Sequence, residues 1–204
     1  IYSNGDYTYT RTAATGGGLR EVFTYTLRDG DGDEDTATLT IRIADAVPTA
    51  GTVNATLDDD TRANGIASGP DDDTPDTSNL TGNLPGSGGD APLAFSFANT
   101  GAPSGFTYDT TTTPGSLFIK QGATTVITVT LNATNGAYTI THNARILHEA
   151  LDGQPGDDTE NNQIFNITYN VTDNDNDVTP GTLTINVDDD TPVGTSETGS
   201  VNEA

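Results

Sequence analysis

The sequence predicts an all-β protein built from antiparallel β-sandwich domains that follow one another in a tandem, linear array. The first observation is that apolar and polar residues alternate along many short segments, which is typical of half-buried strands. The second is an internal repeat at a fixed spacing, and the third is an acidic loop that recurs with it. Together these observations favour a slice of a repeat array over a single large enzyme domain.

Two acidic stretches each lie between a pair of alternating segments. The first is Asp-Gly-Asp-Gly-Asp-Glu-Asp at residues 29–35, between predicted strands at 21–27 and 37–43. The second is Asp-Asn-Asp-Asn-Asp at residues 173–177, between a matching pair of alternating runs. Each acidic stretch is therefore predicted to be the tip of a strand–loop–strand unit.

The two units align without a gap at an offset of 144 residues. We therefore expect the C-terminal half of an immunoglobulin-like or cadherin-like sandwich at 1–46, a complete sandwich repeat at 47–190, and the start of the next repeat at 191–204. The matched pairs are Asp29 and Asp173, Asp31 and Asp175, Asp33 and Asp177, Leu39 and Leu183, Ile41 and Ile185, Ile43 and Val187, and Pro48 and Pro192.

The first segment is predicted to contain strands at 5–10, 21–27 and 37–43. So few strands need a second sheet to cover their apolar face. The segment should be marginal alone, with its missing half upstream in the parent protein or supplied by a neighbouring molecule. Residues 44–48 form the linker, which Pro48 keeps extended.

The complete unit is predicted to be a sandwich with about seven short strands. A loop rich in Gly, Pro, Asp and Ser fills 61–92, and Asn135-Gly136 is a strong two-residue turn signal. Residues 143–151 are the exception, since they could form one or two helical turns. The expected strands are 52–60, one through Phe95 and Phe97, 117–119, 126–131, one through Tyr138 and Ile140, 167–171 and 183–187.

Charge and composition exclude several classes of function. Thirty acidic against seven basic side chains give a net charge of −23, which repels nucleic acid and anionic membranes and favours bound cations. The chain has no cysteine, so disulfides and thiolate metal sites are excluded. No apolar run long enough to span a membrane is present, and we expect no membrane insertion of this segment. Nucleophile, zinc and phosphate-binding motifs are also missing, so we do not expect an enzyme. A glycosidase-like carboxylate pair would need a cleft, which nothing in the sequence predicts.

The alternate spacing of aspartates in the two acidic loops indicates calcium. Ca²⁺ takes six to eight oxygen ligands and tolerates irregular geometry, whereas Mg²⁺ demands a stricter octahedron. Both loops depart from the EF-hand pattern, so the remaining ligands must come from elsewhere, and the linker aspartates are the natural source. We expect one group of Asp29, Asp31 and Asp33 with Asp45, and an equivalent group of Asp173, Asp175 and Asp177 with Asp188, Asp189 or Asp190, to which Asp157, Asp158 and Glu160 contribute.

A simpler interpretation exists for every acidic stretch, because Asp, Asn and Gly make good turns and exposed carboxylates keep a protein soluble. For residues 58–60 and 71–73 the choice between calcium ligands and a solvated loop stays open. His142 and His148 have no partner motif, so we expect surface or packing roles for them.

Eight segments carry a resemblance to known repeats: residues 5–9, 23–33, 93–97, 136–140, 151–152, 156–161, 172–177 and 181–185. Through the segments from 93 onward, the complete unit resembles the type I secretion target repeat of giant adhesins secreted by Gram-negative bacteria, whose length is close to the spacing found here. Residues 5–43 resemble the shorter repeats of the Vibrio, Colwellia, Bradyrhizobium and Shewanella type. One departure is that Asn174 and Asn176 stand where glycine is common.

The resemblance implies an extender region on the cell surface, in which neighbouring repeats follow like beads on a string and calcium stiffens the joints. Such a spacer holds a ligand-binding tip away from the cell. Two alternatives stay open: a carbohydrate- or protein-binding immunoglobulin-like module, and an extracellular fibre in which copies of the chain complete one another head to tail.

Overall fold

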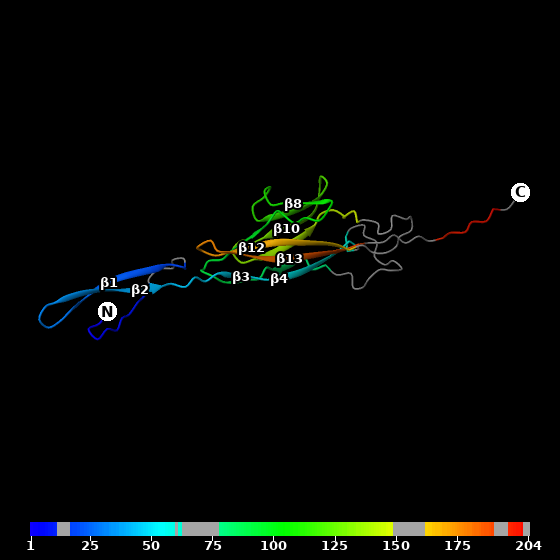
Figure 1. The fold of residues 1–204 in the computed structure, drawn as a ribbon. Helices are drawn as coiled ribbons and strands as arrows, with labels where there is room; N and C mark the ends of the chain where they lie inside the picture. Colours follow the sequence, from blue (N-terminus) through cyan, green and yellow to red (C-terminus); the bar gives the residue numbers. More distant parts are fainter. Residues whose placement is uncertain (12–16, 60, 63–77, 149–161, 190–195, 202–204) are drawn as a thin grey trace.

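The computed structural model describes residues 1–11, 17–59, 61–62, 78–148, 162–189 and 196–201. The predicted all-β sandwich fold is confirmed, and the described residues contain strands but no helix. Accordingly, none of them forms a helix that could span a membrane. Figure 1 shows a separate hairpin at one end, a sandwich in the middle, and residues 196–201 leading away from the other end.

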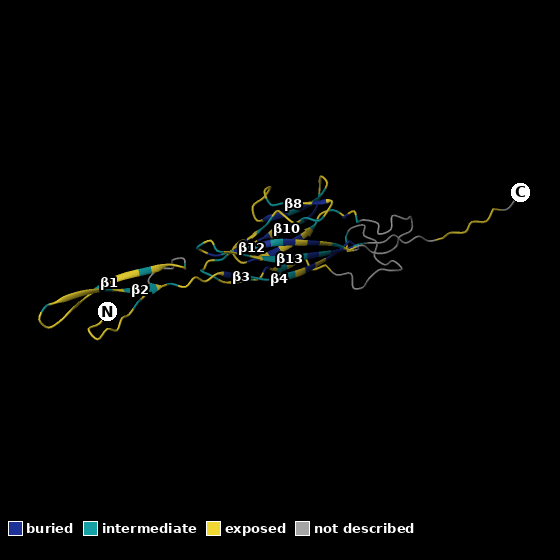
Figure 2. Cartoon of the chain, viewed as in Figure 1, coloured by how far each residue is buried: buried dark blue, intermediate teal, exposed yellow. Residues whose placement is uncertain are grey.

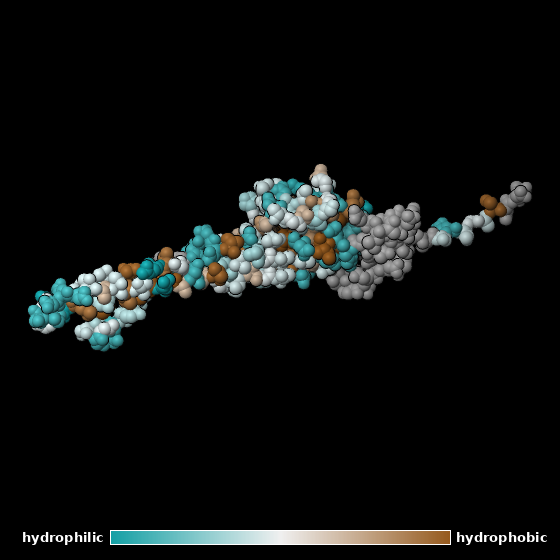
Figure 3. All heavy atoms as spheres, viewed as in Figure 1, coloured by the Kyte–Doolittle hydropathy of each residue, from teal (hydrophilic) through white to brown (hydrophobic). Residues whose placement is uncertain are grey.

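The first module consists of a hairpin, β1 (Arg20–Arg28) and β2 (Glu34–Arg42), with Phe23 opposite Leu39. It pairs with no other strand, so its apolar face stays uncovered in the described chain: the side chains of Phe23 and Leu27 are 43% and 60% exposed. Figures 2 and 3 show this exposed, partly hydrophobic surface. The predicted strand at 5–10 is wrong, because these residues find no hydrogen-bonded neighbour strand.

The second module is a sandwich of two main sheets. One sheet has the order β5-β11-β10-β9-β8, the other has the order β4-β13-β12-β7, and β3 and β6 form a small accessory pair. The strands are β3 (Pro48–Ala50), β4 (Thr52–Asp58), β5 (Thr81–Asn83), β6 (Gly86–Gly88), β7 (Ala94–Phe97), β8 (Phe106–Asp109), β9 (Ser116–Gln121), β10 (Thr124–Leu131), β11 (Ala137–His142), β12 (Gln163–Thr172) and β13 (Val178–Asp188).

The core lies between these two sheets and is built from alternate residues of the central strands, as period-two patterning requires. Phe165 of β12 has no exposed surface and meets the ring of Phe106 edge-on, with 4.9 Å between ring centroids. Tyr169 is equally buried; its hydroxyl donates to the carbonyl of Pro85 at 2.7 Å and accepts from the Gly51 amide at 3.1 Å. The core therefore fixes the strands that carry the loops at each end.

One strand pair is parallel, which the expected antiparallel sandwich did not include. β4 runs alongside β13 with Asp58 opposite Asp188. Both strands begin at the end of the sandwich that faces the hairpin, here called the joint end, and finish at the opposite, distal end. The residues that follow β4 and β13 consequently gather at the distal end.

The predicted helical turns at 143–151 are wrong for residues 143–148, and 149–151 lie outside the described residues. Both groups of the helical bond from the Leu147 amide to the Asn143 carbonyl have other partners. The Leu147 amide donates to Gln121 Oε1 at 2.9 Å, and the Arg62 guanidinium donates to the Asn143 carbonyl at 3.2 Å. Gln121 also donates to the Leu147 carbonyl at 2.8 Å. The predicted loop at 61–92 also contains the short strands β5 and β6 in its described part.

The close packing around Phe165 predicts how much a cavity there would lower the free energy of unfolding. Phe165→Ala should lower the free energy of unfolding by about 3–5 kcal/mol, because the site is closed on all sides and cannot collapse fully. Val178→Ala, at a side chain that is 53% exposed, is the control and should change the same free energy by less than about 0.5 kcal/mol. Denaturant unfolding of both variants measures the difference, and equal losses would contradict the assigned core.

Candidate metal centre at the joint

The acidic loop at 173–177 connects β12 to β13 at the joint end, and Asp173 organises it. The Asp173 amide donates to the carbonyl of Asp177 at 3.1 Å, and the Asp177 amide donates to Asp173 Oδ1 at 2.9 Å. Asn176 adopts a left-handed φ of 76°, the region that its repeat equivalent, Gly32, occupies with φ 107°. Asparagine tolerates this conformation, so the departure from glycine preserves the shape of the turn.

A second loop buttresses the first. The Asp90 amide donates to Asp173 Oδ2 at 3.2 Å, and Asn174 donates to the Asp90 carbonyl at 2.9 Å. Gly89 has φ 66°, and a Cβ placed there would lie 2.7 Å from Asp173 Oδ2, so only glycine allows this approach. The Asp173 carboxylate therefore stabilises the loop by accepting backbone hydrogen bonds. The carboxylates of Asp175 and Asp177 lie toward the linker residue Asp45 instead.

Three carboxylates from both sides of the joint meet there: Asp45 of the linker, and Asp175 and Asp177 of the loop. One oxygen of each lies within 4.8 Å of the others. Gly17, on the hairpin side, donates its amide to Asp175 Oδ2 at 3.1 Å. We call Asp45, Asp175 and Asp177 the joint cluster.

The electrostatics of the joint cluster disfavour three bare negative charges. Asp173, local burial and Asp45 raise the pKa of Asp175, and burial, Asp45 and Asp173 raise the pKa of Asp177. Burial opposes ionisation of Asp173 too, but hydrogen bonds from Asp175, Asp90 and Asp177 outweigh it and lower the Asp173 pKa. Asp175 Oδ1 and Asp177 Oδ2 are shut off from water and accept no hydrogen bond. Such oxygens are what a hard cation would satisfy.

The expected grouping of Asp45 with the first acidic loop needs correction, because the structure brings Asp45 to the second. Asp45 follows β2, whereas the loop at 29–33 precedes it. The nine residues of β2, at about 3.3 Å each, place the two about 25–30 Å apart. For the same reason Asp188 and Asp189, which end the eleven-residue β13, lie at the distal end and away from loop 173–177.

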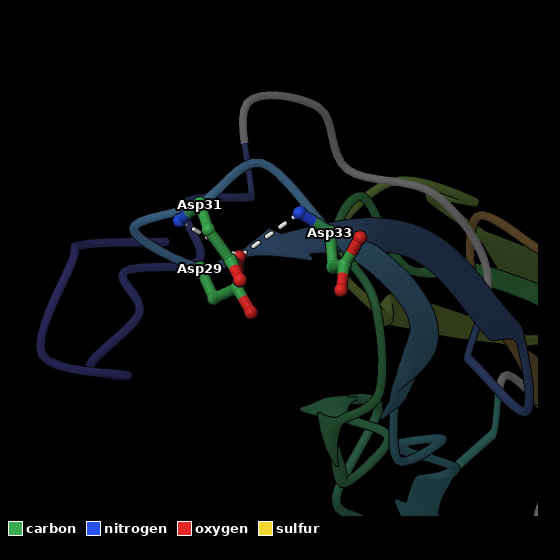
Figure 4. Close-up of side chains that lie close together, drawn as sticks. All are labelled: Asp29, Asp31 and Asp33. Carbon is green, nitrogen blue, oxygen red and sulfur yellow. Dashed lines mark hydrogen bonds between the residues drawn. The ribbon is translucent and has the colours of Figure 1, made fainter.

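The first acidic loop forms a second cluster at the far tip of the hairpin (Figure 4). Asp29 Oδ1 accepts the amides of Asp31, Gly32 and Asp33 at 3.2, 3.0 and 2.9 Å. The hydrogen bond with Asp31 and the Asp33 amide lower the Asp29 pKa. One oxygen of each aspartate lies within 4.8 Å of the others, but all three residues are exposed. In the described chain this loop has no linker carboxylate facing it.

Asp157, Asp158, Glu160 and Asp190, together with residues 60 and 71–73, lie outside the described residues, so their assignment stays a prediction. Sequence reasoning did not find Asp90 or Gly17, because both come from loops whose spacing to 173–177 carries no pattern. It also missed that Asp58 and Asp59 are buried, at 5% and 3% exposure. We expected surface or packing roles for His142 and His148, but both side chains are buried and approach the carboxylate of Asp59.

Burial alone would raise the pKa of Asp59. The close approach of His142 and His148 and the charge attraction between them and the Asp59 carboxylate outweigh burial and hold that pKa well below its usual range.

No family model, curated protein or solved structure matches this chain.

The joint cluster predicts a mutation whose effect changes sign with calcium. In chelator, Asp177→Asn should raise the melting temperature by on the order of a few degrees, because it removes one of three crowded charges. In calcium it should lower the melting temperature relative to wild type, because it removes a ligand. Glu197→Gln makes the same charge change at an exposed residue, and it should have no effect in either condition. An effect of one sign in both conditions would contradict a cation at the joint cluster.

Proposed function

We propose that these modules are calcium-stiffened extender, or spacer, repeats of a large bacterial surface adhesin, which hold a binding tip away from the cell. The observation that carries the proposal is the joint cluster, in which Asp45 of the linker meets Asp175 and Asp177 of the following module. An ion bound there ties the linker to the next sandwich, so the joint loses its freedom to bend.

The donor set of the joint cluster favours Ca²⁺. It consists of carboxylate oxygens alone, two of them buried without a hydrogen bond, and waters or backbone carbonyls would complete six to eight ligands. An irregular loop from two modules suits Ca²⁺ better than Mg²⁺, which requires near-ideal octahedral geometry. Neutralising these charges also relieves the self-repulsion of a chain with a net charge of −23.

The internal repeat places a second acidic loop in the preceding module. Loop 29–33 matches loop 173–177, and it projects away from the sandwich toward the place a preceding module would occupy. Each module would therefore present an acidic loop to the module that precedes it. Secretion to the surface of a Gram-negative cell rests on the resemblance in the repeat motifs.

Solution scattering tests the stiffening. With calcium the chain should scatter as an extended rod, whereas excess chelator should broaden its distance distribution and lower its average length. Mg²⁺ at the same concentration should not restore the rod. The double change Asp45→Asn with Asp175→Asn should behave in calcium as the wild type does in chelator, and Glu197→Gln is the matched control. Identical scattering with calcium and with chelator would overturn the proposal.

The exposed apolar face of the hairpin favours a second candidate, a fibre subunit completed by another copy. Leu19, Phe23 and Leu27 are 48%, 43% and 60% exposed, and Tyr25, Leu27 and Leu39 line a hollow with the N-terminal residues. Exposed apolar patches of this kind mark surfaces that bind another chain. Sedimentation at rising concentration should then show growing head-to-tail assemblies. A protein that stays monomeric at all concentrations would contradict the fibre subunit and favour the spacer.

A further inference from the structure

The distal end of the sandwich carries a separate group of metal-ligating side chains: Asp59, His142, His148 and Asp189, here called the distal cluster. We propose that the distal cluster binds one divalent transition-metal ion of the zinc class. The site lies at the end of the sandwich opposite the joint cluster, so the proposal stands whether or not calcium binds at the joint.

Four segments from both sheets deliver these residues to one place. Asp59 follows β4, and its amide donates to the Asp188 carbonyl at 3.2 Å. His142 is the last residue of β11, in the opposite sheet. His148 lies six residues on, in a segment fixed by the two Gln121 hydrogen bonds to Leu147. Asp189 follows β13 directly. The backbone is therefore fixed before any ligand arrives.

The cluster is closed to water. The side chains of His142, His148 and Asp59 are 7%, 5% and 3% exposed, and that of Asp189 is 17% exposed. Cross-strand partners Asp58 and Asp188 are buried beside it, at 5% and 8% exposure. Burying so many carboxylates together is costly unless cations compensate them. The neighbouring Arg62 guanidinium donates to the Asn143 carbonyl at 3.2 Å.

Three approaches between these side chains are close to the edge length of a tetrahedral site. His142 Nε2 lies 3.0 Å from Asp59 Oδ1, and His148 Nε2 lies 3.7 Å from both Asp59 Oδ2 and Asp189 Oδ1. Ligands about 2.0–2.1 Å from zinc in a tetrahedron are separated by about 3.3 Å. The two imidazoles approach different oxygens of Asp59, so this carboxylate stands between both nitrogens.

The approach of His142 to Asp59 points to a shared centre rather than to a simple pair. Although 3.0 Å separates the two atoms, neither His142 Nε2 nor Asp59 Oδ1 makes a hydrogen bond of acceptable geometry. Both atoms belong to side chains that are more than nine-tenths buried. A nitrogen and an oxygen that come close while aimed past each other have the arrangement that two ligands of one ion adopt.

The donor types decide the metal class. Two imidazole nitrogens with carboxylate oxygens suit zinc and its neighbours, whereas calcium takes oxygen alone. The ion would clip β11 of one sheet to the ends of β4 and β13 of the other. In a chain without cysteine, such a clip closes the long loop between Asp59 and His142 as a disulfide would.

Cobalt serves as the test probe, because tetrahedral Co²⁺ absorbs intensely in the visible range and octahedral Co²⁺ only weakly. The full chain, stripped of metal and held in excess calcium, is titrated with Co²⁺. We expect one equivalent to bind with the tetrahedral spectrum and to be displaced by one equivalent of zinc. His142→Gln and His148→Gln should abolish the spectrum, while Glu197→Gln, at an exposed residue outside both clusters, should leave it unchanged.

The wild-type protein alone can overturn the proposal, even where a histidine variant fails to fold. A weak octahedral spectrum, or no binding with the calcium sites saturated, would mean that the histidines only hold Asp59 as a hydrogen-bonded clamp. Folded histidine variants that bind cobalt as the wild type does would overturn it as well. A rise of several degrees in melting temperature with zinc, lost in both histidine variants, would support the clip between the sheets.

Discussion

The repulsion among carboxylates at the joint is the constraint on which the proposed rod depends. Asp45, Asp175 and Asp177 are brought together by strands that cannot yield, since β12 and β13 are anchored by fully buried core residues. The loop does not relax away, because Asp173 is already committed to its own backbone and to Asp90. The fold therefore holds these three carboxylates close together, and a bound cation would replace their mutual repulsion with a contact between the linker and the sandwich.

The strand order would give the proposed array its direction. The chain enters the sandwich at the joint end through β3, and the parallel pair of β4 and β13 carries both strands to the distal end. Because the last strand finishes opposite the point of entry, a following module of the proposed array would be added end to end rather than side by side. If β13 ran antiparallel to β4, the chain would end at the joint end instead.

Much of the sandwich could be predicted from the sequence, because period-two patterning marks strands such as β10, β12 and β13 and the repeat marks both acidic loops. Which carboxylates meet could not, since spacing along the chain does not say that the nine residues of β2 hold Asp45 far from Asp29. No strand forms at 5–10 because no described strand pairs with it. No helix forms at 143–148 because Gln121 takes the Leu147 amide and Arg62 takes the Asn143 carbonyl. Asp59, His142 and His148 share no motif, and only the sheet order gathers them.

The two ends of the sandwich differ in the ligand atoms that they offer to a metal ion, so the two proposed sites would join different parts of the protein. The joint end offers only oxygen, on exposed or half-buried aspartates, which suits exchange with calcium in the surroundings. The distal end offers nitrogen as well, in a buried setting that excludes water. In the proposed function, calcium at the joint would govern how modules lie relative to each other, whereas a metal ion at the distal histidines would hold the two sheets of one module together. Removing calcium should thus loosen the rod while each sandwich keeps its fold, since the buried side chains of β12 and β9 that form its core, such as Phe165, Ile167, Leu117 and Ile119, are apolar.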